Sequence, residues 1–279
     1  MTALSPRQRL RPSVALGLSA LALAVALTGC GAPESPEALY ARATHAAQAC
    51  DFEEALSLTQ KCLDRRPDYV QALILTGYCR YRLLSPEQVR LDSSTLIAPL
   101  ERAVELAPDD FLAQYYLGWM LFESAQYGRA LKPLERAYEL RAQCPDRDDS
   151  VLAMLSMCCI NQNLARGRTY LQALRRFRGF ERSALLYNAL GYLSVRQRDY
   201  QGALVAFTEA LRREPRHAVT LQNLGVLYDE RLQRPDEAMR YYREALFARQ
   251  AMRDSSRQDE LTRRLRQLAE ARRRPAAGR

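Results

Sequence analysis

The chain has 279 residues, of which 48% are hydrophobic and 26% are charged, and its formal net charge is +9. This composition excludes a disordered chain and provides enough apolar residues for a substantial core. The excess positive charge lies at the two ends, because residues 1–29 carry +3, residues 251–279 carry +5 and residues 30–250 carry only +1. A nearly neutral body argues against a surface that binds nucleic acid.

The N-terminal segment has the pattern of a secretory signal. Arg7, Arg9 and Arg11 precede an apolar run over residues 14–27. A basic region followed by an apolar stretch of this length is typical of a cleaved signal peptide, whereas a membrane-spanning helix needs roughly 20 apolar residues. We therefore expect residues 1–29 to be a signal peptide.

Residues 27–30 read Leu-Thr-Gly-Cys, which resembles the lipobox of bacterial lipoproteins. That resemblance implies cleavage before Cys30 and attachment of a lipid such as palmitate to this residue. Gly31 follows, and the absence of Asp at this place implies the outer membrane, with the protein facing the periplasm. Residues 30–35 would be a short tether. The alternative interpretation is an uncleaved N-terminal helix with an incidental cysteine.

An internal repeat organises the rest of the sequence. Residues 99–106 (PLERAVEL) and residues 133–140 (PLERAYEL) are offset by 34 positions, and Gly191 and Gly225 are separated by the same distance. A period near this length is typical of stacked helical hairpins, each of which must cover its neighbour's apolar face.

Proline and small residues divide the remainder into repeats and a C-terminal segment. A longer connection over residues 83–94 is interpreted as a loop insertion, and Leu261, Leu265 and Leu268 fall on one face of a final amphipathic helix. The expected boundaries are about six units over residues 36–250 (36–68, 69–110, 111–144, 148–180, 183–217 and 218–250), a capping helix over 251–274 and a disordered tail over 275–279.

These units resemble the tetratricopeptide repeat (TPR). The fifth unit matches the family pattern of large and small residues at Tyr187, Leu190, Gly191, Tyr200, Ala203, Phe207, Ala210 and Pro215. The resemblance implies an all-α fold, namely a right-handed superhelix of stacked antiparallel helix hairpins with a C-terminal capping helix. Glycine at the helix crossing would let two backbones approach closely, with large residues beside it.

The resemblance also implies a concave groove lined by the first helix of each unit. Mapped onto this sequence, the aromatic groove positions include Tyr78, Tyr81, Tyr115, Trp119, Phe122 and Tyr192. Aromatic side chains bury a large area at low entropic cost, which suits capture of a peptide or helix. The alternative is that these rings pack inside the superhelix.

Motifs for catalysis or for metal and cofactor binding were not found, so we expect neither an enzyme nor a cofactor. His45 is expected on a helix and His217 in a turn after Pro215, each at a surface or boundary position, and neither has metal-ligand spacing. Two interpretations are possible for the cysteines other than Cys30. They form disulfides, for example between Cys62 and Cys79, or they are buried thiols that serve as packing residues.

The layout of a lipobox followed by about six repeats resembles the pilotin-type lipoproteins that assemble the type IV pilus secretin. It implies a lipid-anchored scaffold that binds a segment of an envelope protein and is held at the membrane through Cys30. Two alternatives remain: an adaptor or regulatory subunit of a peptidoglycan enzyme, and a structural spacer.

Overall fold

The computed structural model describes residues 34–91, 93–143, 148–177, 180, 183–251 and 258–273. The signal peptide, Cys30, most of the expected tether, Cys144 and the tail at 275–279 lie outside these residues. The chain divides into two compact units, with the boundary between residues 158 and 159. We call them the N-terminal and C-terminal units and describe each by itself.

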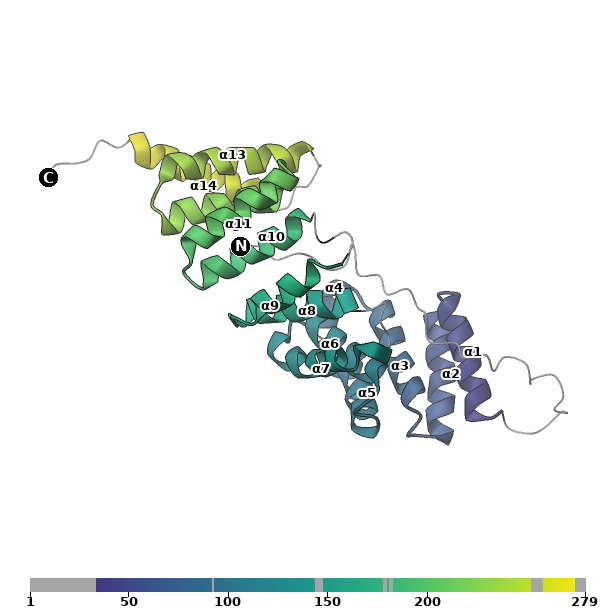
Figure 1. The fold of residues 1–279 in the computed structure, drawn as a ribbon. Helices are drawn as coiled ribbons and strands as arrows, with labels where there is room; N and C mark the ends of the chain where they lie inside the picture. Colours follow the sequence, from purple (N-terminus) through teal and green to yellow (C-terminus); the bar gives the residue numbers. More distant parts are fainter. Residues whose placement is uncertain are drawn as a thin grey trace. The chain divides into compact units, whose positions relative to one another are not determined.

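Both units are built from helices, and the described residues contain no strand (Figure 1). The N-terminal unit contains α1 (Pro36–Gln48), α2 (Phe52–Arg65), α3 (Val70–Leu83), α4 (Pro86–Leu91), α5 (Ser93–Leu106), α6 (Phe111–Glu123), α7 (Tyr127–Glu139), η2 (Arg141–Gln143) and most of α8 (Asp148–Asn161). The C-terminal unit contains α9 (Gly167–Leu174), α10 (Ala184–Arg196), α11 (Tyr200–Arg213), α12 (Ala218–Val226), η4 (Leu227–Arg231), α13 (Pro235–Ala251) and α14 (Gln258–Arg273).

Successive helices pack as hairpins, and successive hairpins pack on one another within each unit. The principal pairs are α1 with α2, α3 with α5, α6 with α7, α10 with α11, and α12 with α13. In each unit, consecutive hairpins also touch, as α2 does with α3 and α11 with α12. The predicted all-α solenoid of stacked hairpins is therefore confirmed.

Aspartate side chains cap the start of two second helices, α2 and α11, and of one first helix, α6. The carboxylate of Asp51 accepts a hydrogen bond from the Glu54 backbone at 3.1 Å, and Asp199 accepts one from the Gly202 backbone at 2.9 Å. Asp110 does the same at the start of α6, where the Ala113 N–H donates at 2.8 Å. Each carboxylate satisfies a backbone donor that has no partner within the helix, and its charge suits the positive end of the helix dipole.

The turn inside four of the hairpins places one residue in the left-handed region. These residues are Cys50 (φ 64°) between α1 and α2, Ala125 (59°) between α6 and α7, Arg198 (62°) between α10 and α11 and Gln233 (56°) between η4 and α13, and Asn163 (56°) follows α8. Around Ala125, the N–H of Gln126 donates to the carbonyl of Leu121 at 2.8 Å, which closes the end of α6. This is the hydrogen-bonded C-terminal turn in which glycine is usually preferred.

A glycine on the first helix meets a large side chain of the second helix in four hairpins. A Cβ atom built on Gly77 would lie 2.8 Å from Leu100 Cγ. Cβ atoms built on the other three glycines would lie only 2.5–2.6 Å from the nearest side-chain atom, and the pairs are Gly118 with Leu134, Gly191 with Phe207 and Gly225 with Tyr242. Real Cβ atoms do not approach so closely, so only glycine permits these crossings. The predicted role of these glycines in close backbone approach is confirmed.

The predicted capping helix corresponds to α14. Leu261 and Leu268 are buried, and Leu265 and Ala269 pack against the same core cluster, which includes Met239 of α13. Most of the remaining side chains of α14 are exposed. One apolar stripe against the last repeat and a polar outer face are what a terminal solenoid helix requires.

The connection over residues 83–94 differs from the prediction of a loop. It contains the short helix α4, and α5 already begins at Ser93. The side chain of Val89 is fully buried, whereas that of Leu91 is 87% exposed. The hydroxyl of Ser124 donates to the Val89 carbonyl at 3.4 Å. The side chains of Ser85 and Gln88 cap each other's backbone N–H at the start of this helix, at 3.3 and 2.7 Å, and the buried Val89 packs it against its neighbours.

Compared with the fifth unit, the sixth unit has one extra residue between the glycine of its first helix (Gly225) and the first small residue of its second helix (Ala238). The first helix accommodates it as a π-helical turn, η4, that directly follows α12. In η4 the N–H of Leu232 donates to the carbonyl of Leu227 at 3.0 Å, five residues back. Such turns are often found at functional sites. Here the turn contains Asp229, which is buried although it is acidic.

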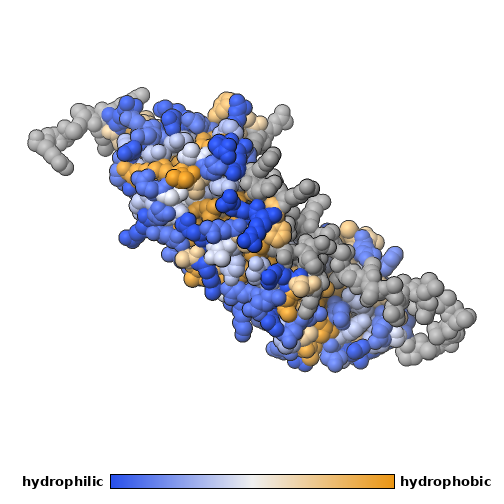
Figure 2. All heavy atoms as spheres, viewed as in Figure 1, coloured by the Kyte–Doolittle hydropathy of each residue, from blue (hydrophilic) through white to orange (hydrophobic). Residues whose placement is uncertain are grey.

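The visible face of the molecule is largely hydrophilic, with smaller hydrophobic patches between the charged side chains (Figure 2). The large apolar side chains that are exposed include Val205 of α11 and Phe247 of α13. Within the described part of the chain, none of the helices combines the length and the apolar character needed to cross a membrane.

Candidate partner-binding sites

An aromatic cluster joins α3 and α6 in the N-terminal unit. We define it as Tyr78, Tyr115, Tyr116 and Trp119. The ring centroids of Tyr78 and Tyr116 are 6.0 Å apart, those of Tyr115 and Tyr116 are 5.4 Å apart, and those of Tyr116 and Trp119 are 5.7 Å apart. Edge-to-face and tilted contacts of this kind stabilise packing beyond the area they bury.

The structure buries most of the residues predicted to line a groove. Tyr78 and Tyr115 are each 3% exposed, Trp119 is 4% exposed and Phe122 is 6% exposed. Helix α6 is buried on nearly all sides, since eleven of its thirteen residues are buried. The expectation of an open aromatic face on α6 is therefore not met, and a partner-binding role for these four residues stays a prediction.

Tyr81 and Tyr192 differ from the other predicted groove residues because both are partly exposed. The ring of Tyr81 lies 4.9 Å from that of Trp119, and its hydroxyl donates to Glu123 Oε2 at 3.3 Å. Tyr192 lies on α10 in the C-terminal unit. These two side chains have surface with which a partner could make contact, and within the N-terminal unit Tyr81 packs against the aromatic cluster.

A buried polar network joins α10 and α12 in the C-terminal unit. The amide of Asn223 and the hydroxyl of Thr220 donate to Asn188 Oδ1 at 2.9 and 3.1 Å, and His217 Nδ1 lies 2.6 Å from Thr220 Oγ1. All four residues are less than 9% exposed. Asn188 accepts both of these bonds, so the network fixes how two neighbouring first helices face each other, although the buried Asn223 Oδ1 has no hydrogen-bond partner within the described part of the chain.

His217 departs from the sequence expectation of a surface or boundary position. It begins α12 and is only 8% exposed, because its ring is bonded to Thr220 one turn into the helix. Burial lowers the pKa of its imidazole below the ordinary value, and the carboxylate of Glu214 opposes this effect. The spacing of His217 and Thr220, three residues apart, is the sequence signal from which this contact could have been inferred.

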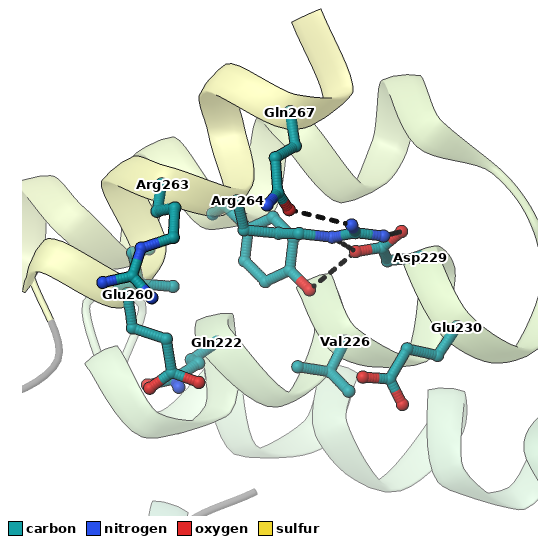
Figure 3. Close-up of a pocket in the computed structure, with 10 residues that line it drawn as sticks. Gln222, Val226, Asp229, Glu230, Glu260, Arg263, Arg264 and Gln267 are labelled. Atoms are coloured by element: carbon teal, nitrogen blue, oxygen red, sulfur yellow. Dashed lines mark hydrogen bonds and ion pairs between the residues drawn. The ribbon is translucent and has the colours of Figure 1, made fainter. Parts of the chain in front are cut away.

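A pocket of about 290 Å³ opens between the sixth unit and α14 (Figure 3). Its lining comes from α12, η4, α13 and α14, and it combines apolar and polar groups that include Gln222, Val226, Asp229, Tyr242, Leu261 and Arg264. This pocket could not be predicted from the sequence, since its lining residues come from elements that are far apart along the chain.

An ion pair between a buried carboxylate and a partly exposed guanidinium forms one wall of the pocket. Arg264 Nε donates to Asp229 Oδ2 at 2.6 Å and Arg264 Nη2 donates to Asp229 Oδ1 at 2.8 Å. The hydroxyl of Tyr242 also donates to Asp229 Oδ2, at 3.2 Å. Burial, with the adjacent Asp229 carboxylate second, raises the pKa of the Tyr242 phenol. The hydrogen bonds to Asp229 are the main cause of the raised pKa of Arg264.

Most of the described cysteines are buried thiols. Cys62 and Cys79 are both fully buried and are not joined, and Cys158 and Cys159 are also buried. The Cys62 thiol donates to the Pro36 carbonyl at 3.3 Å, which fits the interpretation of a packing residue. Burial raises the pKa of the Cys79 thiol to about 12, so this thiol stays protonated at neutral pH.

Comparison with protein families identifies tetratricopeptide repeats in two stretches, residues 97–147 and 188–254. Among solved structures, the chain is similar to YrrB, a TPR protein with an unusual peptide-binding site (20% identity, TM-score 0.58, 66% of this chain and 89% of that chain). It is also similar to a tetratricopeptide repeat protein from Parabacteroides merdae (13%, 0.58, 85% and 94%) and to pilF of Pseudomonas aeruginosa (16%, 0.54, 82% and 97%). No curated protein matches the sequence. Identities this low show a shared fold only.

Proposed function

Because the chain is an all-α solenoid of tetratricopeptide repeats, we propose that it is a lipid-anchored scaffold that binds a segment of an envelope protein. The observation that carries this proposal is the surface of the first helices of the repeats. Two of them, α3 and α10, carry the partly exposed aromatic side chains Tyr81 and Tyr192, and a third, α12, forms one wall of a pocket with polar and apolar groups. Surfaces with an apolar floor and a few directed polar groups suit recognition of peptides.

The proposed location at the outer membrane rests on the N-terminal sequence. The basic and apolar segments before residue 28 and the lipobox-like residues 27–30 support export and acylation of Cys30. Several acyl chains on one cysteine would anchor the protein firmly, whereas a single chain binds membranes only marginally. Gly31 supports the outer membrane, so the repeats would face the periplasm.

We assign the scaffold to assembly or localisation of an envelope complex, with the type IV pilus secretin as the first candidate. The support is the shared layout of lipobox and repeats, together with a fold similar to that of Pseudomonas aeruginosa pilF. The similarity to YrrB, with its peptide-binding site, supports a peptide segment as the kind of ligand.

Membrane fractionation of the variant Cys30→Ala tests the anchor. We expect this variant to lose acylation and to appear in the fraction released without detergent. Cys50→Ala is the matched control, because Cys50 is exposed in the turn after α1 and stands outside the lipobox. If Cys30→Ala still needs detergent for release from the membrane fraction, as Cys50→Ala does, then Cys30 does not anchor the protein.

A further inference from the structure

The carboxylate of Asp229 is held in a site whose geometry matches a guanidinium group. Both carboxylate oxygens are engaged by Arg264, through two N–H donors at 2.6 and 2.8 Å, and the hydroxyl of Tyr242 supports one of these oxygens. Arg264 Nη1 donates onward to Gln267 Oε1 at 3.2 Å. A planar fork of this kind is specific for arginine, since the ammonium of lysine is a point charge that cannot bond both oxygens in parallel.

The two side chains of this ion pair differ in their exposure to solvent. The Asp229 side chain is 6% exposed, whereas that of Arg264 is 44% exposed. Asp229 belongs to the π-helical turn η4, whereas the long side chain of Arg264 extends from α14 to reach it, as Figure 3 shows. Rotation of the Arg264 side chain into solvent would leave Leu261 and Leu268 packed and α14 in place. It would also leave a buried carboxylate without its cation, which is costly.

The charge of the pocket lining indicates what could replace Arg264. Without this side chain, the lining retains the carboxylates of Asp229, Glu230 and Glu260 and the single guanidinium of Arg263. The remaining charge is −2, which favours a cationic ligand. Val226 and Tyr242 line the same pocket, where Tyr242 is bonded to Asp229, and they offer apolar surface to the aliphatic part of a long side chain.

We propose that the pocket between α12 and α14 recognises an arginine side chain of a partner segment, and that Arg264 occupies this site within the chain until the partner arginine replaces it. This inference rests on the proposed function, because it specifies the partner that a scaffold of this kind would select. In this arrangement, the intramolecular arginine keeps Asp229 neutralised when no partner is bound. It also weakens ligands that cannot form the same two hydrogen bonds.

Binding to the full chain and to the variant Arg264→Gln tests the proposal. The probes are three capped tripeptides, Ala-X-Ala, in which X is arginine, lysine or citrulline, and binding is measured by titration calorimetry. We expect Arg264→Gln to bind the arginine peptide about tenfold more tightly than the unmodified chain does, because the internal competitor is gone. The lysine peptide should bind more weakly, and the citrulline peptide, which has the shape without the charge, should not bind measurably.

The double variant Asp229→Asn with Arg264→Gln is the matched control. It removes both charges, so α14 keeps its leucine contacts without a buried carboxylate, and it should not bind the arginine peptide. If Arg264→Gln is too unstable for calorimetry, thermal unfolding replaces it. The arginine peptide should then raise the midpoint of Arg264→Gln and leave that of the double variant unchanged.

Equal binding of arginine and citrulline peptides, or equal responses of the single and double variants, would overturn the arginine site. Neither result bears on the membrane fractionation of Cys30→Ala or on capture of an envelope protein at Tyr192 of α10. A failure of this proposal can therefore be distinguished from a failure of the proposed scaffold function.

Discussion

Gly225 lies so close to Tyr242 that a Cβ atom on Gly225 would stand 2.5 Å from both Cδ1 and Cε1 of the tyrosine ring. The same ring extends to the pocket, where its hydroxyl donates to Asp229 at 3.2 Å. Tyr242 therefore connects the glycine crossing that builds the last repeat with the ion pair that joins this repeat to α14. The packing of the repeat and the geometry of the pocket depend on the same side chain.

Replacing Gly225 by alanine should destabilise the protein. In an unobstructed helix this change would stabilise by up to about 1 kcal/mol, but here the added methyl group meets an aromatic ring, and overpacking of this kind costs about 1–3 kcal/mol. Urea denaturation should show the loss. Gly128→Ala is the control, because Gly128 is exposed in the first turn of α7, and it should cause no loss. Equal stability of the two variants would contradict the close crossing.

Replacing Ala125 by glycine should stabilise the protein. Ala125 has φ 59° in the turn between α6 and α7, and the left-handed conformation costs a residue with a Cβ atom about 1 kcal/mol. We expect Ala125→Gly to recover about this amount in thermal or urea unfolding. Ala98→Gly, at an exposed position inside α5, should instead lose about 1 kcal/mol. If both glycine variants lose stability, the turn does not have the conformation described.

The buried imidazole of His217 should make folding stability depend on pH. Burial lowers its pKa in the folded state, so the unfolded chain binds a proton first as the pH falls below about 6.5. The contribution of His217 to the free energy of unfolding is therefore fully present above that pH. It decreases on acidification by at most about 1.4 kcal/mol per pH unit. Comparing urea unfolding of the unmodified chain and of His217→Gln between pH 7.5 and 5.5 isolates the effect. An unchanged difference between the two proteins across this range would refute it.

The sequence was sufficient to predict the hairpins, their glycine crossings and the apolar stripe of α14, because these features recur at a fixed period. Gly191 with Phe207 is an example, since both positions match the repeat pattern. The left-handed turns could not be predicted from composition. Their residues, which are cysteine, alanine, asparagine, arginine and glutamine, share no side-chain property that favours this conformation.

The candidate site could be predicted only in part. Helix α6 has two apolar faces, and periodicity alone does not show whether the second face meets solvent or other parts of the protein. Trp119 therefore seemed equally suited to a groove and to a core, and the structure buries it. The pocket near Asp229 was missed for a different reason. It depends on a π-helical turn and on an arginine 35 residues away in sequence, and neither leaves a recognisable motif.

Photo-cross-linking in living cells tests most directly whether the first helices of the repeats capture an envelope protein. A benzophenone amino acid at Tyr192, which is partly exposed on the first helix α10, should give a discrete cross-linked product that mass spectrometry identifies as an envelope protein. The same group at Val205, which is 72% exposed on the second helix α11, should not give this product. Identical products from both positions, or no product from Tyr192 when the protein is present at its normal level, would contradict the account.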